Sequence, residues 1–172
     1  LRSSVAGLGS FFVLPAVEQR AEEQKRDRRK DPRKFAYRTL GKTGVKLPVI
    51  TMGVMNSDNP NLIRAALDAG MVHLDTAHGY MRGKNEEVIG GVIKGRPRDS
   101  FVIGTKIYLP RDESTGLHKE TATEQFFLSR LDTSLKRLGL DYVDILYHHN
   151  VWKRESALYE PALKALEKAK KE

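Results

Sequence analysis

Cysteine is absent from the 172-residue sequence. Its absence excludes disulfides, thiolate metal sites and iron–sulfur ligation within these residues, and no metal site is predicted. The chain is also too short for a complete (β/α)₈ barrel, which needs about 250 residues. Its composition, 40% hydrophobic and 30% charged, is typical of a globular protein and argues against an intrinsically disordered one.

Long hydrophobic runs are missing as well. Residues 5–17, VAGLGSFFVLPAV, contain two glycines and a proline and fall short of the roughly 20 residues that span a bilayer, so no stable transmembrane anchor is predicted. Their length fits the apolar region of an export signal. We predict an export-signal-like segment at residues 1–19, similar to a bacterial twin-arginine signal, which would direct the protein to the periplasm. The alternative is an ordinary N-terminal helix or strand of a cytoplasmic protein.

Acidic residues are fewer than basic ones, and the net charge is +8. Residues 20–34 carry eight basic and four acidic side chains, and so account for half of this excess. No aromatic side chain that could stack on a base lies among them. We interpret residues 20–34 as a solvated basic linker and predict no nucleic-acid partner. Residues 35–172 are predicted to form one domain.

From Phe35 onward the pattern becomes that of a folded α/β domain. Glycines at both ends of residues 41–44 indicate a β-hairpin. Four strand–helix pairs follow, which favours a parallel sheet with right-handed crossovers. No Gly-rich phosphate-binding fingerprint follows the first of these strands, so a dinucleotide-binding Rossmann domain is disfavoured. The predicted strands are residues 49–54, 72–75, 101–106 and 142–149.

The helices between these strands are predicted from caps and apolar spacing. Asn59 and Pro60 are expected to begin the first helix, and Gly139 to end the third. Thr121 with Glu124 is typical of a capping box. Two faces are expected to pack inward: one with Leu62, Ile63, Ala66 and Leu67, the other with Ala162, Leu163, Leu166 and Ala169.

Ionisable side chains stand where three of the four predicted strands end. Asp75 ends the second strand, with Tyr80 in the following loop; Lys106 ends the third; His148 and His149 end the fourth. Each has an ordinary structural explanation when taken singly, such as a helix cap or a solvated loop residue. In a parallel α/β fold, however, functional residues gather at the carboxyl ends of the strands. We therefore expect these side chains to face one site.

The combination suits one kind of chemistry. A tyrosine, with a pKa of about 10, holds its proton near neutral pH and needs help to release it. A nearby ammonium favours the phenolate, and a carboxylate supplies the counter-charge that a buried lysine needs. Asp75, Lys106 and Tyr80 would thus form a tuned general acid, with a histidine at the oxygen being protonated. Such a set can protonate a carbonyl oxygen while a hydride reaches its carbon.

Over residues 35–172 the sequence resembles the aldo-keto reductase family. The matching segments are YRTLGKTGVKLP, LDTAHGYMRGKNEEVIGGVI, FVIGTK and RLDTSLKRLGLDYVDILYHHN. The resemblance implies a TIM (β/α)₈ barrel, of which this chain would hold the N-terminal hairpin and the first four βα units. It implies that Asp75, Tyr80, Lys106 and His149 form the catalytic tetrad. His149 is chosen because it lies five residues after Asp144, and strand alternation turns His148 to the other face.

The resemblance also implies ligands. The cofactor would be NADPH, with NADH as the alternative, near Gly53, Val54, Met55 and Asp75; the carbonyl substrate would meet Tyr80 and His149. Asn85 and Glu86 match a G-x-N-E stretch that we interpret as structural, and Gly83 as a turn residue. His78 and Arg82 are expected beside the mouth of the barrel, either as solvated loop residues, which is the simpler interpretation, or in contact with substrate. Met55, Met81, Tyr108 and Trp152 are expected either as an apolar wall there or as core and loop residues.

Two functions are compatible with these observations. The first is an NADPH-dependent carbonyl reductase in which Tyr80 is the general acid. The second is a non-catalytic regulatory or binding protein on the same scaffold, as in the potassium-channel β-subunits of the family. The resemblance places strand five and the remaining cofactor contacts beyond residue 172. We therefore expect the missing C-terminal half of the barrel to be the partner of this segment, which by itself would be inactive.

Overall fold

The computed structural model describes residues 35–171. The predicted export signal (1–19) and linker (20–34) lie outside these residues and stay predictions. Within residues 35–171 no helix has the length and apolar character needed to cross a membrane.

The strands are β1 (Tyr37–Thr39), β2 (Lys46–Pro48), β3 (Met52–Gly53), β4 (His73–Asp75), β5 (Val102–Ile107) and β6 (Ile145–His148). The α-helices are α2 (Pro60–Asp68), α3 (Lys84–Ile93), α4 (Glu124–Leu138), α5 (Arg154–Ala157) and α6 (Glu160–Lys171), and two 3₁₀ turns are η2 (Tyr80–Gly83) and η3 (Arg98–Ser100).

The first two strands form the predicted hairpin. β1 and β2 are antiparallel, with Tyr37 opposite Pro48. The hairpin continues one step further, because the Val49 amide donates to the Ala36 carbonyl over 2.8 Å. Val49 is therefore tied to the hairpin and not to the parallel sheet. The strand predicted at residues 49–54 is correspondingly shorter and consists only of β3.

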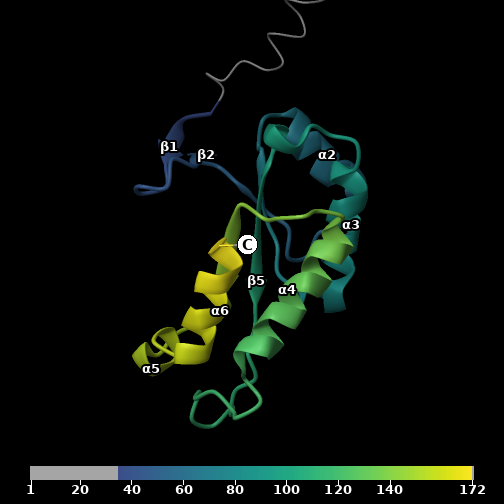
Figure 1. The fold of residues 1–172 in the computed structure, drawn as a ribbon. Helices are drawn as coiled ribbons and strands as arrows, with labels where there is room; N and C mark the ends of the chain where they lie inside the picture. Colours follow the sequence, from purple (N-terminus) through teal and green to yellow (C-terminus); the bar gives the residue numbers. More distant parts are fainter. Residues whose placement is uncertain (1–34, 172) are drawn as a thin grey trace, which may run out of the picture. The chain divides into compact units, whose positions relative to one another are not determined.

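The other four strands form a parallel sheet in the order β3-β4-β5-β6. Gly53 lies opposite Asp75, and Lys106 opposite Tyr147, so the carboxyl ends of the strands come together at one edge. The helices pack in chain order, α2 beside α3, α3 beside α4, and α4 beside α6 (Figure 1). This arrangement confirms the predicted series of parallel βα units.

Two apolar clusters hold the helices on the sheet. The first involves α2, α3, the end of α4 and strands β4 and β5, and the second involves β5, α4 and α6. The buried members of the first are Val54, Ile63, Leu67, Leu74, Ile89, Val92, Ile93, Phe101, Ile103 and Leu138. Those of the second are Ile107, Leu109, Ala122, Phe127, Ala162 and Ala165.

Local signals account for the start of α2 and the end of α4. The Asn59 side chain accepts from the Asn61 amide at the start of α2, as predicted. Gly139 ends α4 in the left-handed conformation, with φ of +67°. The capping box predicted at Thr121 is wrong. Thr123 caps α4 through the Phe126 amide, because Ala122 is fully buried and a turn from Lys119 delays the start of the helix.

The predicted inward faces need two corrections. Leu62 of α2 and Leu163 of α6 are exposed, at 54% and 42%. On α6 the fully buried residues are Ala162 and Ala165, which share an apolar cluster with Phe127 of α4, so these small side chains let the two helices lie close together. The short helix α5 precedes α6 and was not predicted.

Two adjacent glycines on α3 give a matched test of this packing. A Cβ on Gly90 would lie 2.4 Å from the Arg137 carbonyl oxygen, whereas one on Gly91 would meet nothing within 4 Å. We expect Gly90→Ala to destabilise the complete protein by about 3 kcal/mol, because α3 and α4 would be pushed apart. Gly91→Ala should stabilise it by about 0.5–1 kcal/mol, because alanine is the better helix former. Urea unfolding of both variants checks this; equal effects would contradict the close approach.

Candidate active site

The carboxyl edge of the sheet brings together the four residues predicted to act as a tetrad. Asp75 ends β4, Lys106 lies one residue before the end of β5, and His149 directly follows β6. Tyr80 begins the 3₁₀ turn η2, which follows β4. The loops carrying these residues are tied to the neighbouring strand, since the His149 amide donates to the Ile107 carbonyl over 2.9 Å.

Lys106 is the centre of this group. Its ammonium forms an ion pair with the Asp75 carboxylate and donates to the Thr76 carbonyl over 2.7 Å. It also lies 3.5 Å from the Tyr80 hydroxyl oxygen and 5.0 Å from the centre of the Tyr80 ring. With the Lys106 side chain only 16% exposed, these oxygen partners replace the water that the ammonium has lost. A fixed positive charge therefore stands beside the Tyr80 hydroxyl.

His149 also lies next to the tyrosine. The two ring centres are 5.7 Å apart, and the planes meet at 78°. Burial holds the pKa of His149 below its ordinary value; the positive charges of Lys106 and Arg111 act in the same direction, and Asp75 opposes them. The imidazole is thus neutral near pH 7 and carries one N–H that can be donated to an oxygen next to Tyr80.

His148 points to the opposite face of the sheet. Its ring stacks on that of His118, with centres 5.1 Å apart, and lies against Phe127 of α4. Strand alternation places it there, as the sequence predicts. Burial is the main cause that lowers the pKa of His148 to about 4, helped by the neighbouring charges of His118, Arg111 and His149. The two adjacent histidines therefore have different surroundings.

The low pKa of His148 predicts a loss of stability in acid. Below pH 6.5 His148 of the unfolded chain takes up a proton, whereas in the folded protein it does so only near pH 4. The native state therefore loses up to about 3 kcal/mol as the pH falls from 6.5 to 4. We expect His148→Phe, which cannot titrate, to remove this part of the pH dependence.

The measurement is the free energy of unfolding of the wild type and His148→Phe at pH 7 and pH 4.5. The free energy of unfolding of the variant minus that of the wild type should be larger at pH 4.5 than at pH 7. An unchanged difference between the two proteins would show that His148 titrates normally.

The residues predicted to meet the cofactor separate into two kinds. Gly53 is exposed, and a Cβ there would meet nothing within 4 Å. Met55 is 52% exposed. Val54, by contrast, is fully buried; its amide faces the Asp75 carbonyl and its carbonyl accepts from the Asn85 side chain. Direct contact of Val54 with a ligand is therefore disfavoured, whereas Gly53, Met55 and the Asp75 carboxylate remain accessible.

Two residues facing this site were not predicted. Tyr147 lies with its ring centre 5.8 Å from the Lys106 ammonium, and burial is the first cause that raises the pKa of Tyr147. His73 is buried two residues before Asp75 on β4, and burial lowers its pKa. Strand alternation was the available signal, because Tyr147 shares a face with His149, and His73 with Asp75.

Arg111 was also missed. It is 7% exposed, and its guanidinium lies 4.0 Å from the ring centre of Trp152 and 4.8 Å from that of Tyr108. It donates to the carbonyl of Asn150, the residue after His149. Tyr108 and Trp152, expected as part of an apolar wall or as core or loop residues, are exposed loop residues whose rings lie against this cation. A charged residue in a long loop carries no sequence pattern that would have revealed the contact.

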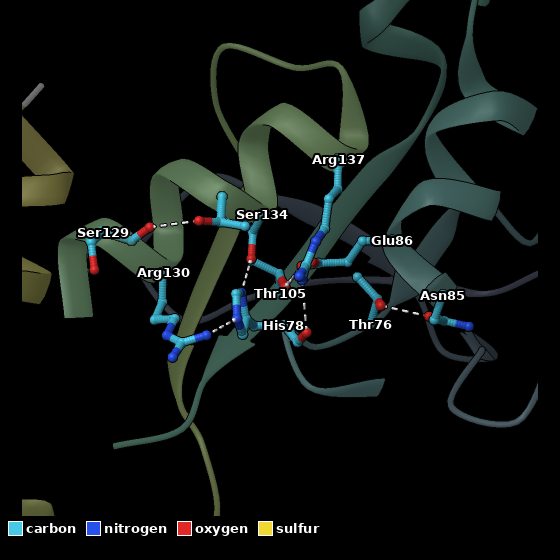
Figure 2. A network of polar contacts seen from close by, with 10 residues as sticks. Thr76, His78, Asn85, Glu86, Thr105, Ser129, Arg130, Ser134 and Arg137 are labelled. Carbon is cyan, nitrogen blue, oxygen red and sulfur yellow. Dashed lines mark hydrogen bonds and ion pairs between the residues drawn. The ribbon is translucent and has the colours of Figure 1, made fainter. Parts of the chain in front are cut away.

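His78 is partly buried, and its ring lies against α4. Its two ring nitrogens lie 3.1 Å from Ser134 and 3.1 Å from Arg130, both on α4 (Figure 2). Asn85 and Glu86 are fully buried at the start of α3, which agrees with the structural role predicted for them. Arg82 is exposed in the turn η2.

Comparison with known proteins agrees with this architecture. A sequence model of the aldo/keto reductase family matches residues 51–172. The chain belongs to the aldo/keto reductase family. Its fold is that of the family's (β/α)₈ barrel, of which the described residues form the hairpin and four of the eight βα units.

Individual family members share a substantial part of this sequence. An Escherichia coli protein named L-glyceraldehyde 3-phosphate reductase is 34% identical over 128 residues, covering 67% of this chain and 36% of its own length. A Schizosaccharomyces pombe protein, assigned as a voltage-gated potassium channel subunit beta, is 32% identical over 130 residues, with coverages of 69% and 37%. The chain thus spans little more than a third of the length of these relatives.

One solved structure is that of an aldo-keto reductase from Klebsiella pneumoniae in complex with NADPH. It superposes on this chain with a TM-score of 0.57 at 26% identity, over 73% of this chain and 42% of the other. This likeness extends the family resemblance from sequence to fold.

Proposed function

We propose that the complete protein is a nicotinamide-dependent oxidoreductase that reduces an aldehyde or ketone to an alcohol, with Tyr80 as general acid. The observation that carries this proposal is the placement of the Lys106 ammonium between the Asp75 carboxylate and the Tyr80 hydroxyl at one edge of the sheet. The His149 ring lies edge-on to that of Tyr80, with the ring centres 5.7 Å apart. The names of family relatives support an oxidoreductase role for the whole protein.

Each of the four residues has a separate task in this proposal. His149, neutral near pH 7, donates its N–H to the substrate carbonyl oxygen and so fixes the carbonyl beside Tyr80. Tyr80 gives its hydroxyl proton to that oxygen as negative charge develops there. The Lys106 ammonium stabilises the phenolate that remains, and Asp75 keeps the ammonium in place. Solvent then returns a proton to Tyr80.

NADPH is the proposed cofactor, with NADH as the alternative. The bound nicotinamide supplies the hydride that reaches the carbonyl carbon. Gly53 leaves a surface without a side chain at the end of β3, directly opposite Asp75 in the sheet. That surface fits a flat ring, Met55 offers it an apolar contact, and the Asp75 carboxylate can accept from ribose hydroxyls. Support for the phosphorylated form comes from the NADPH complex of the Klebsiella pneumoniae relative.

The direct test is turnover by the complete protein. NADPH and NADH are each offered with a series of aldehydes and ketones, and oxidation of the cofactor is followed by its absorbance. The proposal expects cofactor oxidation that depends on the carbonyl compound and yields one equivalent of alcohol. Tight cofactor binding without turnover across the whole series would contradict it.

A non-catalytic role is the second candidate. The observation that favours it is the 32% identity to a protein assigned as a potassium channel β subunit. Such a role requires the scaffold and does not require proton donation by Tyr80. Partner binding that survives unchanged in Tyr80→Phe, together with no carbonyl reduction by the wild type, would favour this candidate over the first.

A further inference from the structure

The segment that carries Tyr80 is conformationally strained. The two residues after the tyrosine, Met81 and Arg82, have φ values of 49° and 55°. This left-handed region costs free energy for residues with a side chain, and it persists only where the surroundings hold it. The contacts that hold the segment therefore also fix the position of the Tyr80 hydroxyl.

Those contacts come from one face of α4. Arg130, Ser134 and Arg137 are spaced by four and three residues, so they share a face of the helix. The first two reach the ring of His78, as described above. The Arg137 guanidinium donates to the His78 carbonyl over 3.0 Å (Figure 2).

His78 in turn is tied to the catalytic edge of the sheet. His78 stands two residues before Tyr80, and its amide donates to the carbonyl of Lys106 over 3.0 Å. His78 thus contacts α4 through its ring and its carbonyl, and it contacts β5 through its amide. Through His78, α4 therefore sets the distance between the Tyr80 hydroxyl and the Lys106 ammonium, which the proposed proton transfer needs.

Arg137 is itself held by a buried carboxylate. Glu86 is fully buried; one of its carboxylate oxygens lies 3.2 Å from the Arg137 guanidinium, and the other accepts from the Thr105 hydroxyl over 2.8 Å. Gly83 closes the arrangement, because a Cβ there would stand 2.3 Å from the Arg137 guanidinium carbon. The turn after Tyr80 can therefore lie directly on the guanidinium group only because Gly83 lacks a side chain.

We propose that Arg137, held by Glu86, is a positioning residue for Tyr80, which it acts on through His78 and the strained turn 80–83. The inference rests on the proposed function and deepens it: Arg137 touches no reacting atom, yet it sets the geometry of proton donation. A misplacement of about 1 Å by a change remote from the chemistry costs about 10²-fold in rate.

Arg137→Met in the complete protein tests this proposal. We expect kcat to fall by about 10²-fold with KM nearly unchanged, because the substrate still meets its own contacts while the proton donor is displaced. The solvent deuterium isotope effect on kcat should rise, since proton transfer becomes the slower step. Amide hydrogen exchange of residues 78–83 should accelerate.

Two further variants keep the test decisive. Met at position 137 leaves the Glu86 charge unpaired, so the double variant Glu86→Gln with Arg137→Met removes both charges and should show the same kcat loss if the single variant folds poorly. Arg98→Met is the matched control, because the Arg98 side chain is 24% exposed, against 23% for Arg137, and it pairs with Asp144 over 2.7 Å at the opposite end of β5. It should lower thermal stability without changing kcat, the isotope effect or exchange at 78–83.

The outcomes separate this inference from the proposed function. If the Arg137 variants keep the wild-type kcat and isotope effect while Tyr80→Phe is inactive, the positioning role is wrong and the function stands. If the wild type lacks reductase activity but Arg137→Met still accelerates exchange at 78–83 and Arg98→Met does not, the function is wrong and the positioning role stands. Equal effects of the Arg137 and Arg98 variants on exchange at 78–83 would overturn the positioning role in either case.

Discussion

Tyr80→Phe in the complete protein is expected to lower kcat for carbonyl reduction by about 10²–10⁴-fold, the usual contribution of a positioned general acid. The ring stays, so its contact with His149 remains, and only the hydroxyl that lies 3.5 Å from the Lys106 ammonium is lost. Binding of NADPH should change little, because the proposed cofactor contacts are at Gly53, Met55 and Asp75. Steady-state kinetics and a cofactor titration measure the two effects separately.

Tyr142→Phe provides the matched control. Tyr142 is 55% exposed and lies against Arg98, near the amino end of β5. Removal of its hydroxyl should leave kcat at the wild-type level. If Tyr80→Phe were as active as Tyr142→Phe, Tyr80 would not be the proton donor.

Lys106→Met is expected to cause the second large fall in kcat. The substitution keeps much of the side chain's volume but removes the charge that pairs with Asp75 and faces the Tyr80 hydroxyl. Loss of one preorganised group that stabilises developing charge costs about 10²–10³-fold in kcat. We expect a fall of that size at saturating substrate, measured in the same assay as for Tyr80→Phe.

Lys84→Met tests whether loss of any lysine near the site has the same result. Lys84 pairs with Glu87 on the surface of α3, and its side chain is 64% exposed. Exposed pairs of this kind contribute about 0–1 kcal/mol, so neither stability nor kcat should change appreciably. A comparable loss in both variants would mean that net charge, and not the place of Lys106, controls the rate.

The sequence was informative wherever the position of a residue along a strand decides where its side chain points. Alternation along a strand separates His149 from His148, and the carboxyl ends of parallel strands gather Asp75 and Lys106. These rules depend only on backbone periodicity, which survives any detail of packing. The catalytic roles of these residues stay predictions until the variants are measured.

Other features depend on packing and could not be foreseen. Thr121 has the stronger local capping signal, because Glu124 stands three residues after it whereas Phe126 follows Thr123 at that distance, yet Thr123 is the cap. The burial of Ala122 and the turn from Lys119 outweigh the local signal. Leu163 is more hydrophobic than Ala165, yet the close approach of α6 to α4 favours the smaller residue inside. His78 was expected in solvent because nothing in its own loop shows that α4 brings Ser134 against its ring.

The most direct test of the account is a double-mutant cycle on Tyr80 and Lys106 in the complete protein. If Lys106 acts by stabilising the charge left on Tyr80, the two residues form one unit and their losses do not add. The value of kcat for Tyr80→Phe with Lys106→Met should then equal that of Tyr80→Phe alone. Losses that multiply in the double variant would show that the two residues act independently and would contradict the claim that Lys106 acts through Tyr80.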